Sequence, residues 1–279
     1  MLAWAKRGTS AGERFETVAP VVNLRSVRAP TEVTLAPLKL LTFNIQVGIK
    51  TTKYRQYVTK GWKHVLPNGS RANNLRRIAD LVADYDLVAL QEIDAGSLRS
   101  GFVNQVEYLA DRAQFPYWYA QLNRDLGPLA QHGNGVLSRV RPTGIEDHKL
   151  PGAIPGRGAI FLRVPYAGVE VLLVLLHLSL GGRSRLAQLE YVREQIAGEK
   201  HVVVMGDMNT PHKGLMAGSP LADIDLQPAL PAQATYPAWR PELSLDHILA
   251  SPTLQIDDAQ VLNCRLSDHL PLAVTLTLA

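Results

Sequence analysis

Short apolar runs bounded by polar turns recur along the chain and predict a protein rich in strands. The clearest runs are LKLLTFNI at 38–45, DLVALQE at 86–92, VEVLLVLLHL at 169–178, HVVVMGD at 201–207 and LPLAVTLTL at 270–278. Their length and their many aliphatic and β-branched residues are typical of buried strands and fall short of a membrane span. Further strands are expected at 117–122, 134–140, 158–164, 245–251 and 259–264.

Three segments instead repeat apolar residues at helical spacing. RANNLRRIADLVADY covers residues 71–85, and GFVNQVEYLADRA covers residues 101–113. RSRLAQLEYVREQIAG, residues 183–198, predicts an amphipathic helix whose inward face carries Leu186, Leu189, Val192 and Ile196. Long apolar strands between a few helices predict an α/β fold in which two sheets pack face to face and carry helices outside.

Length and composition predict one large domain that needs no disulfides. The chain has 279 residues, 46% of them hydrophobic and 19% charged, and Cys264 is its single cysteine. Residues 1–37 contain three prolines and show no clear period, so we expect a loosely attached arm before a domain at 38–279. No run is long enough for a secretory leader or a membrane span, and a soluble, cytoplasmic, monomeric protein is expected.

The distribution of charge is more informative than its sum. The formal net charge is +4, yet residues 46–79 contain no acidic residue at all. The basic residues that begin this stretch are Lys50, Lys53 and Arg55, and the aromatic residues among its basic ones are Tyr54, Tyr57 and Trp62. Such a run is either a solvated face or a loop that handles an anionic substrate, and both interpretations stay open.

Polar, chemically capable residues stand at the ends of strands that are otherwise apolar. Asn44 follows LTF, Glu92 follows LVALQ, His177 follows VLL and Asp207 follows VVVMG. Singly, each is explained as a turn residue, a helix cap or a satisfied core histidine. Together with SDHLP at 267–271, they form a set that turn chemistry explains poorly.

These motifs, taken in order, resemble the endonuclease/exonuclease/phosphatase superfamily. The resemblance runs from about Leu38 to Leu278 and depends on LTFNIQ, LVALQEID, GNGVLSR, LLHLSL, VVVMGDMNTP, LDHILAS and LSDHLPL. The pairing of GDMN with a later SDHLP is its most specific part. The resemblance implies a four-layered α/β sandwich of two packed mixed sheets with helices outside, and an active site at one end of the sheets.

The resemblance also implies a divalent-metal site. It makes Glu92 the principal ligand, places Asn44 beside it, and leaves Asp268 for the same or a second ion. Carboxylate and amide oxygens suit Mg²⁺ or Mn²⁺ rather than zinc. One-metal and two-metal mechanisms both remain open.

The remaining catalytic roles follow from the same resemblance. Asp207 would position the attacking water and Asn209 the phosphate, while His269 would pair with Asp246 close to the scissile phosphate. His177 would donate to a phosphate oxygen and stabilise charge as it develops. Either Asp207 or His269 is the general base.

The chain departs from the family pattern at His132, where members often carry an aromatic hydroxyl before the Gly-Asn pair. His132 either replaces that group as a phosphate donor or is a plain loop histidine. His247 follows Asp246 directly and should point to the opposite face of its strand, so it is left out. An acidic partner for His177 is not evident, and its candidates are Asp94, Glu107 and Asp125.

A hydrolase that cleaves a phosphate ester with Mg²⁺ or Mn²⁺ is therefore the leading hypothesis. Lys50, Lys53 and Arg55, with the aromatic residues beside them, slightly favour nucleic acid as the substrate over a lipid headgroup. A lipid enzyme should show an exposed apolar edge, which the sequence does not reveal. A soluble phosphomonoester is a further alternative, and a non-catalytic binding module fits least because every proposed site residue is present.

Overall fold

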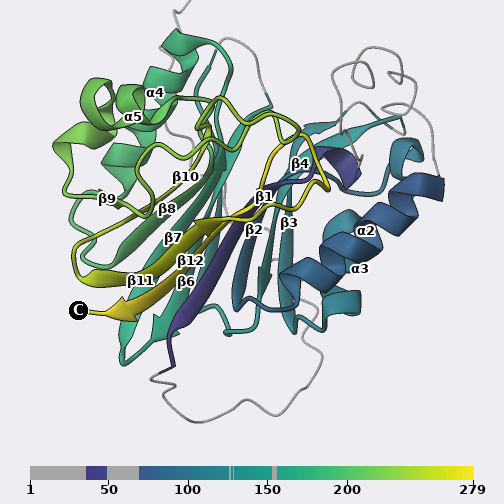
Figure 1. The fold of residues 1–279 in the computed structure, drawn as a ribbon, viewed down its shortest axis with the longest axis horizontal. Helices are drawn as coiled ribbons and strands as arrows, with labels where there is room; N and C mark the ends of the chain where they lie inside the picture. Colours follow the sequence, from purple (N-terminus) through teal and green to yellow (C-terminus); the bar gives the residue numbers. More distant parts are fainter. Residues whose placement is uncertain (1–35, 49–68, 126, 128, 153–155) are drawn as a thin grey trace, which may run out of the picture.

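The computed structural model describes residues 36–48, 69–125, 127, 129–152 and 156–279. Within them, two six-stranded mixed sheets pack face to face, with helices on the two outer faces (Figure 1). This confirms the predicted α/β sandwich. The expected arm at 1–37 lies outside the described residues except for its last two positions, and Lys50, Lys53 and Arg55 lie outside them as well.

The first sheet has the strand order β11-β12-β1-β2-β4-β3. Its central strands β1 and β2 are parallel, and its other neighbours are antiparallel. The strands are β1 (Leu38–Asn44), β2 (Leu87–Asp94), β3 (Tyr117–Asp125), β4 (Gln131–Ser138), β11 (Leu254–Val261) and β12 (Leu272–Leu278).

The second sheet has the order β5-β6-β7-β8-β10-β9, with β7 and β8 parallel. Its strands are β5 (Gly144–Lys149), β6 (Gly158–Tyr166), β7 (Val169–His177), β8 (Val202–Asp207), β9 (Gln227–Pro228) and β10 (Asp246–Ala250). The sequence pattern did not predict β5, because its residues GIEDHK are mostly polar at the edge of the sheet.

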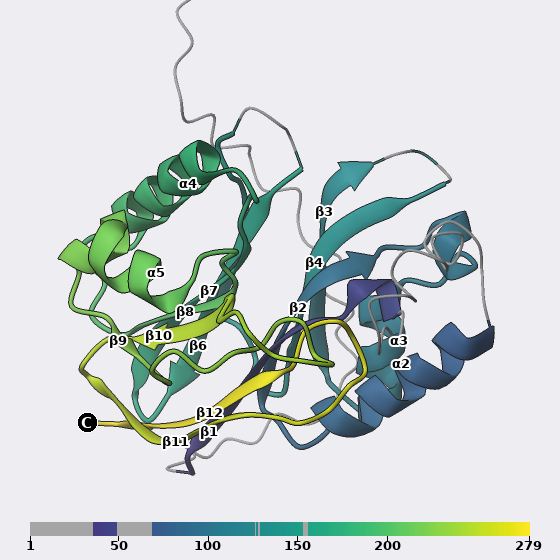
Figure 2. The ribbon, with the colours of Figure 1, turned by 45° about the horizontal axis from the view of Figure 1, so that its top comes forward.

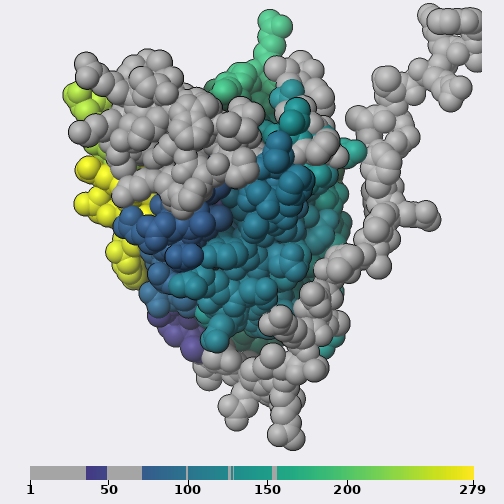
Figure 3. All heavy atoms as spheres, turned by 90° about the vertical axis from the view of Figure 1, so that its right-hand side faces the viewer, coloured from purple at the N-terminus to yellow at the C-terminus, as the bar shows by residue number. Residues whose placement is uncertain are grey.

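Helices cover the outer face of each sheet (Figures 1 and 2). The helices α2 (Gly69–Val82) and α3 (Gln105–Ala113) pack on the first sheet, and Figure 3 shows them covering that side of the molecule. The helices α4 (Gly182–Gln195) and α5 (His212–Gly218) pack on the second. The part of the chain that the structure describes also forms three short 3-10 helices, η1 (Gln46–Gly48), η3 (Leu98–Ser100) and η4 (Pro220–Asp223). None of the helices in the described ranges has the length and hydropathy needed to cross a membrane.

Both faces of the central strands are buried, which explains their unbroken apolar runs. In β7, Leu173 and Leu175 belong to the core between the sheets, while Leu172 and Val174 belong to the core beneath α4 and α5. A strand covered on both sides needs apolar residues at every position. The apolar runs therefore identified these strands correctly.

Leu186 corrects one sequence-based expectation. It was expected on the inward face of α4, but its side chain is 48% exposed, whereas Leu189 and Val192 are buried against the second sheet. Leu186 lies near the start of α4, where the helix reaches the end of the sandwich (Figure 1). The buried residues of α4 are Gln188, Leu189 and Val192, and at 3.6 residues per turn Leu186 lies on the flank of the helix beside this face.

Candidate active site

The predicted strand-end residues gather at one end of the sandwich, which we call the site end. Asn44 ends β1 and Asp207 ends β8. In the second sheet, His177 and Asp246 are the register partners of Asp207 in the strands on either side of it. Asp207 is therefore the central acid of three adjacent strands, because carboxyl ends of parallel strands meet at one edge and β10 begins there.

Gly206 permits the close approach of β7 and β8 just before Asp207. Its φ is +144°, and a Cβ atom there would lie 2.0 Å from the carbonyl oxygen of Leu176. No side chain fits at that distance. The Gly-Asp pair of the GDMN motif is thus a packing requirement that places the Asp207 carboxylate beside His177.

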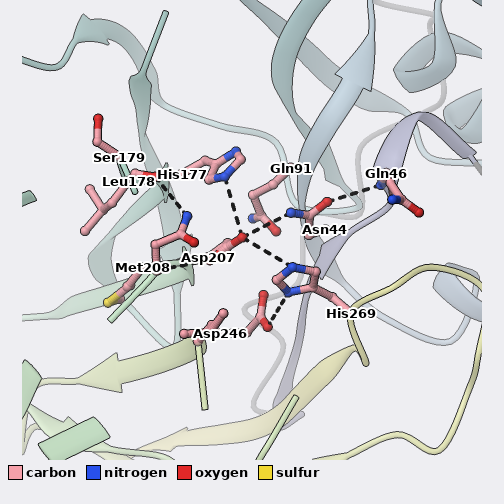
Figure 4. A network of polar contacts seen from close by, with 12 residues as sticks. Asn44, Gln46, Gln91, His177, Leu178, Ser179, Asp207, Met208, Asp246 and His269 are labelled. Carbon is pink, nitrogen blue, oxygen red and sulfur yellow. Dashed lines mark hydrogen bonds and ion pairs between the residues drawn. The ribbon is translucent and has the colours of Figure 1, made fainter. Parts of the chain in front are cut away.

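Asn44 bridges the two sheets at this point. Its Nδ2 donates to Asp207 Oδ2 at 3.1 Å, and its Oδ1 accepts from the backbone N–H of Gln46 at 3.1 Å (Figure 4). These two bonds fix which end of the amide faces Asp207. The contact connects β1 of the first sheet with β8 of the second.

Two histidines face the same carboxylate oxygen. His177 Nε2 lies 3.5 Å from Asp207 Oδ2, and His269 Nε2 lies 3.7 Å from it. On the other side of its ring, His269 Nδ1 lies 2.8 Å from Asp246 Oδ2 (Figure 4). Asp246 thereby orients the His269 ring so that Nε2 points at Asp207, which is the expected imidazole and carboxylate pair.

Burial and neighbouring charge set opposite protonation states for the two histidines. Burial lowers the pKa of His177 well below its usual value, and the positive charge of Arg157 adds to that effect. Burial also opposes the charged form of His269, but the carboxylates of Asp246 and Asp207 outweigh it and raise its pKa well above the usual value. Burial therefore favours the neutral form of His177, whereas the two carboxylates favour the protonated form of His269.

Asp207 is tuned to titrate near neutrality. Burial raises its pKa to about 7, against the lowering effect of His269, and the nearby Asp246 charge adds to the rise. The Asn44 amide and the backbone N–H of Asn209, 3.0 Å from Oδ1, stabilise its ionised form. A carboxyl group whose pKa lies near the working pH is suited to general base catalysis.

Glu92 occupies a β-bulge of β2. The register between β2 and β4 shifts between Leu90 and Ile93, and Glu92 has a φ of +54°, in the left-handed region that non-glycine residues rarely adopt. Bulges re-aim side chains, and backbone strain of this kind concentrates at functional sites. Glu92 is half-buried and lies close enough to Asp268 for its charge to act on that carboxyl group.

The donor set fits a hard divalent cation. Burial raises the pKa of Asp268 to about 6, with the Glu92 charge contributing. Asp207, Asp246 and His269 offer ligand atoms that all lie within 4.8 Å of one another, and Asp246 Oδ1 is buried without a hydrogen-bond partner. Crowded, buried carboxylates are costly unless a cation neutralises them, and their oxygens are the ligands that Mg²⁺ and Mn²⁺ prefer.

Arg157, which precedes β6 at the site end, was not among the predicted residues. Its carbonyl accepts from the backbone N–H of Leu150 at 3.0 Å, and it lies in electrostatic range of Glu92, Asp207 and His177. Burial lowers the pKa of its guanidinium, while the carboxylates of Glu92 and Asp207 oppose that change. The sequence clue was an arginine between two glycines at the start of an apolar strand, in PGRGAIF.

The glycine after Arg157 is required by the packing around it. A Cβ at Gly158 would lie 2.2 Å from Asn123 Oδ1 and 2.5 Å from Gln121 Oε1. Asn134, from the GNG motif, donates to Gln121 Oε1 and to the Gly158 carbonyl, both at 3.0 Å. This network connects β3 and β4 with β6, and so it fixes the backbone that carries Arg157.

The other predicted residues are placed as follows. Asn209 donates from its amide to the Leu178 carbonyl at 3.0 Å, which holds the loop after β8 against the end of β7. His132 is the register partner of Asp94 between β4 and β2. It lies near enough to His177 for its positive charge to lower the pKa of the His177 ring. His247 points away from the site and contacts the Thr210 carbonyl at 2.8 Å, as strand alternation requires.

Comparison with known proteins agrees with this geometry. The sequence model of the Endonuclease/Exonuclease/phosphatase family matches residues 41–269. The chain belongs to this family. The match spans the strand-end residues and ends at His269, which confirms the resemblance seen in the motifs. Membership of this family supports phosphoester hydrolysis as the general activity of the chain. Proteins of the family generally depend on divalent metals.

Solved structures of the family share the fold at low sequence identity. An endonuclease/exonuclease/phosphatase from Beutenbergia cavernae DSM 12333 is 21% identical, with a TM-score of 0.66, covering 88% of this chain and 72% of that chain. Mannosyl-6-phosphatase Bt3783 of Bacteroides thetaiotaomicron VPI-5482 is 16% identical (TM-score 0.64; 86% and 99% covered). D. rerio TDP2 complexed with a single-strand DNA product is 18% identical (TM-score 0.63; 86% and 99%). No curated protein matches the chain by sequence.

Proposed function

We propose that this protein is a Mg²⁺- or Mn²⁺-dependent hydrolase that cleaves a phosphate ester by direct attack of water. The observation that carries the proposal is the connected set of Asp207, His269 and Asp246, joined to Asn44 across the two sheets. A buried acid of raised pKa beside an oriented imidazolium offers both a base and a donor within one site. Water is the proposed attacking group, and Asp207 is the base proposed to activate it.

Glu92 and Asp268 are the residues proposed to hold the metal, with Asn44 supplying a further oxygen. Bound there, the ion supplies Lewis-acid chemistry to the phosphoryl and leaving oxygens. The observation in favour is that burial and the Glu92 charge raise the pKa of Asp268 to about 6, which marks a site where negative charges crowd together. These residues bind the metal ion, whose charge they balance, and other groups carry out the proton transfer.

The opposite protonation states of the site residues assign the remaining roles. Asp207, with a pKa of about 7, accepts the proton of the attacking water. His269 is already protonated at neutral pH, so it cannot act as the base, and it donates instead to a phosphoryl oxygen as charge develops there. Asp246 holds its ring, and Asn209 holds the loop that follows Asp207.

Arg157 is proposed to bind the non-bridging oxygens of the phosphate. Arg157 is half-buried, and its guanidinium lies within electrostatic range of Glu92 and Asp207. Arginine binds phosphate oxygens in a forked geometry that lysine does not reproduce. Lys50, Lys53 and Arg55 remain candidates for contacts farther along the substrate.

Arg157→Gln is expected to lower kcat/KM on the order of 10- to 100-fold, because a charged hydrogen bond to the phosphate is lost. Steady-state kinetics on bis(p-nitrophenyl) phosphate measures the loss. Arg141→Gln is the matched control, since Arg141 is exposed at the opposite end of the sandwich. Equal kinetics for the two variants would show that Arg157 does not touch the substrate.

The proposed function is tested directly with a substrate panel. Purified protein with Mg²⁺ is assayed against supercoiled DNA, single-stranded RNA, sphingomyelin, inositol phosphates, p-nitrophenyl phosphate and bis(p-nitrophenyl) phosphate. We expect turnover of at least one of them, and the two nitrophenyl compounds separate monoesterase from diesterase activity. Failure to hydrolyse any member with either Mg²⁺ or Mn²⁺ would favour the non-catalytic binding module.

A further inference from the structure

The large apolar side chains that the described residues expose all lie at the site end of the molecule. They belong to the strand ends and connections there: the β2–α3 connection, the β3–β4 hairpin, the β7–α4 connection with the start of α4, and the loop before β10. The residues, which we call the apolar rim, are Phe102, Val103, Leu122, Leu129, Leu180, Leu186 and Leu243. Within the same described ranges, the connections at the opposite end expose no large apolar side chain.

Phe102 is presented to solvent by an ordered loop. Its side chain is 65% exposed, and its φ of +62° is unfavourable for a bulky residue. Asp94 accepts hydrogen bonds from Gly96 N, Ser97 N and the hydroxyls of Ser97 and Ser100. The Phe102 N–H donates to the Ser97 carbonyl at 2.8 Å. Backbone strain of this kind concentrates at functional sites.

Two further segments carry the rim around the site. Leu122 and Leu129 flank the tip of the β3–β4 hairpin, which stands up at the site end in Figure 2. Leu180 is the most exposed of the set at 75%, and it lies three residues after His177. Arg185 donates to the carbonyls of Ser179 and Leu180, so this connection is also held in place.

Basic side chains lie among these apolar residues. Arg124, two positions from Leu122, is exposed, and so is Arg183 near Leu180. From Leu178 to Leu189 the chain contains two arginines and no acidic residue. Aliphatic and aromatic side chains that insert into a bilayer, with arginines at the level of lipid phosphates, form an interfacial binding surface. Nucleic acid would instead be matched by stacking aromatics and polar donors.

We propose that the apolar rim docks the protein on an anionic phospholipid surface, so that the phosphate site opens onto the phosphorylated headgroups of membrane lipids. The evidence for docking is the set of exposed apolar side chains and the positive charge of the arginines beside them. The choice of a lipid headgroup as substrate rests on the proposed function. It departs from the preference for nucleic acid that the basic stretch at 46–79 gave.

Vesicle sedimentation tests the docking without any need for turnover. The full chain should sediment with vesicles of phosphatidylcholine and phosphatidylserine, and less with phosphatidylcholine alone. The variant Phe102→Ser/Leu129→Ser/Leu180→Ser should bind on the order of 100-fold more weakly, because three inserted apolar side chains are lost. A double change at the opposite end, Ala197→Ser/Lys200→Ser, should bind as the wild type does.

A matched pair of arginine variants tests the electrostatic part. Arg183→Ser should weaken binding to the anionic vesicles about fivefold, whereas Arg141→Ser, the same change at the opposite end, should leave it unaltered. Circular dichroism and turnover of bis(p-nitrophenyl) phosphate show whether the rim variant keeps its fold and site. Vesicle binding in a protein that hydrolyses no phosphate ester would retain the docking surface and reject the proposed function.

Other occupants of the rim give different outcomes, and each overturns the proposal. Wild-type protein that does not sediment with anionic vesicles excludes a membrane surface. A dimer in light scattering that dissociates in the triple variant, without vesicle binding, assigns the rim to a second copy of the chain. Retention of DNA or RNA that is lost in the triple variant, again without vesicle binding, assigns it to nucleic acid.

Discussion

Replacing His269 by alanine is expected to lower kcat by about 10³-fold, within the range that a positioned proton donor or acceptor contributes. The ring is buried, lies 3.7 Å from Asp207 Oδ2, and is oriented by Asp246 at 2.8 Å. Its raised pKa keeps it charged at neutral pH, so alanine removes a cation from the place where negative charge develops. Steady-state kinetics with Mg²⁺ on bis(p-nitrophenyl) phosphate measures the effect.

Two controls separate this loss from a folding defect. His201→Ala removes a half-buried histidine that contacts Thr253 at the opposite end, and it should leave kcat unchanged. Asp246→Asn should cost less than His269→Ala, because it disturbs the orientation of the ring and leaves the ring in place. If His269→Ala unfolds, His269→Gln provides a variant of similar polarity, and normal turnover in a folded variant would remove His269 from the mechanism.

Glu92→Gln is expected to weaken Mg²⁺ binding by at least about 100-fold, the upper end of what even an indirect ligand contributes. The substitution keeps the shape of the side chain and removes its charge at the bulge of β2, where Glu92 faces Asp268. Titration calorimetry with Mn²⁺ measures the affinity without requiring turnover. Activity should also fall to background in excess EDTA and return when Mg²⁺ is restored.

Glu107→Gln is the matched control for the metal site. Glu107 is exposed in the first turn of α3, so the same change there should leave both affinity and activity unaltered. Wild-type affinity in Glu92→Gln would move the ion to Asp207, Asp246 and His269, whose ligand atoms lie within 4.8 Å of one another. Full activity in EDTA would reject metal dependence altogether.

Most of the sandwich was predictable because its central strands are buried on both faces. Nearly continuous apolar runs in β7 and β8 identify such strands from the sequence. The edge strand β5 escaped prediction because its sequence, GIEDHK, carries polar residues at half-exposed positions. An edge strand is only partly buried, so its sequence need not show the apolar pattern that burial requires of a central strand.

The candidate site was predictable in part for a similar physical reason. Asn44, His177 and Asp207 each end an apolar strand. The parallel strands β7 and β8 bring His177 and Asp207 to one edge of their sheet, and the packing of the two sheets brings Asn44 to Asp207. Arg157 and the apolar rim were not predicted. An arginine beside glycines is common in any chain, and so are leucines in loops. Their significance depends on where the connections lie in space.

The sequence by itself determined the α/β sandwich, the family and the set of strand-end residues, because these depend on local apolar patterns and on the order of short motifs. Only the tertiary structure decided the protonation of the site, since the pKa values of Asp207, His269 and His177 depend on burial and on charges from other strands. It also decided which apolar residues remain exposed. Leu186 was expected on the inward face of its helix, yet its side chain is 48% exposed because the buried face of α4 is centred on Gln188, Leu189 and Val192.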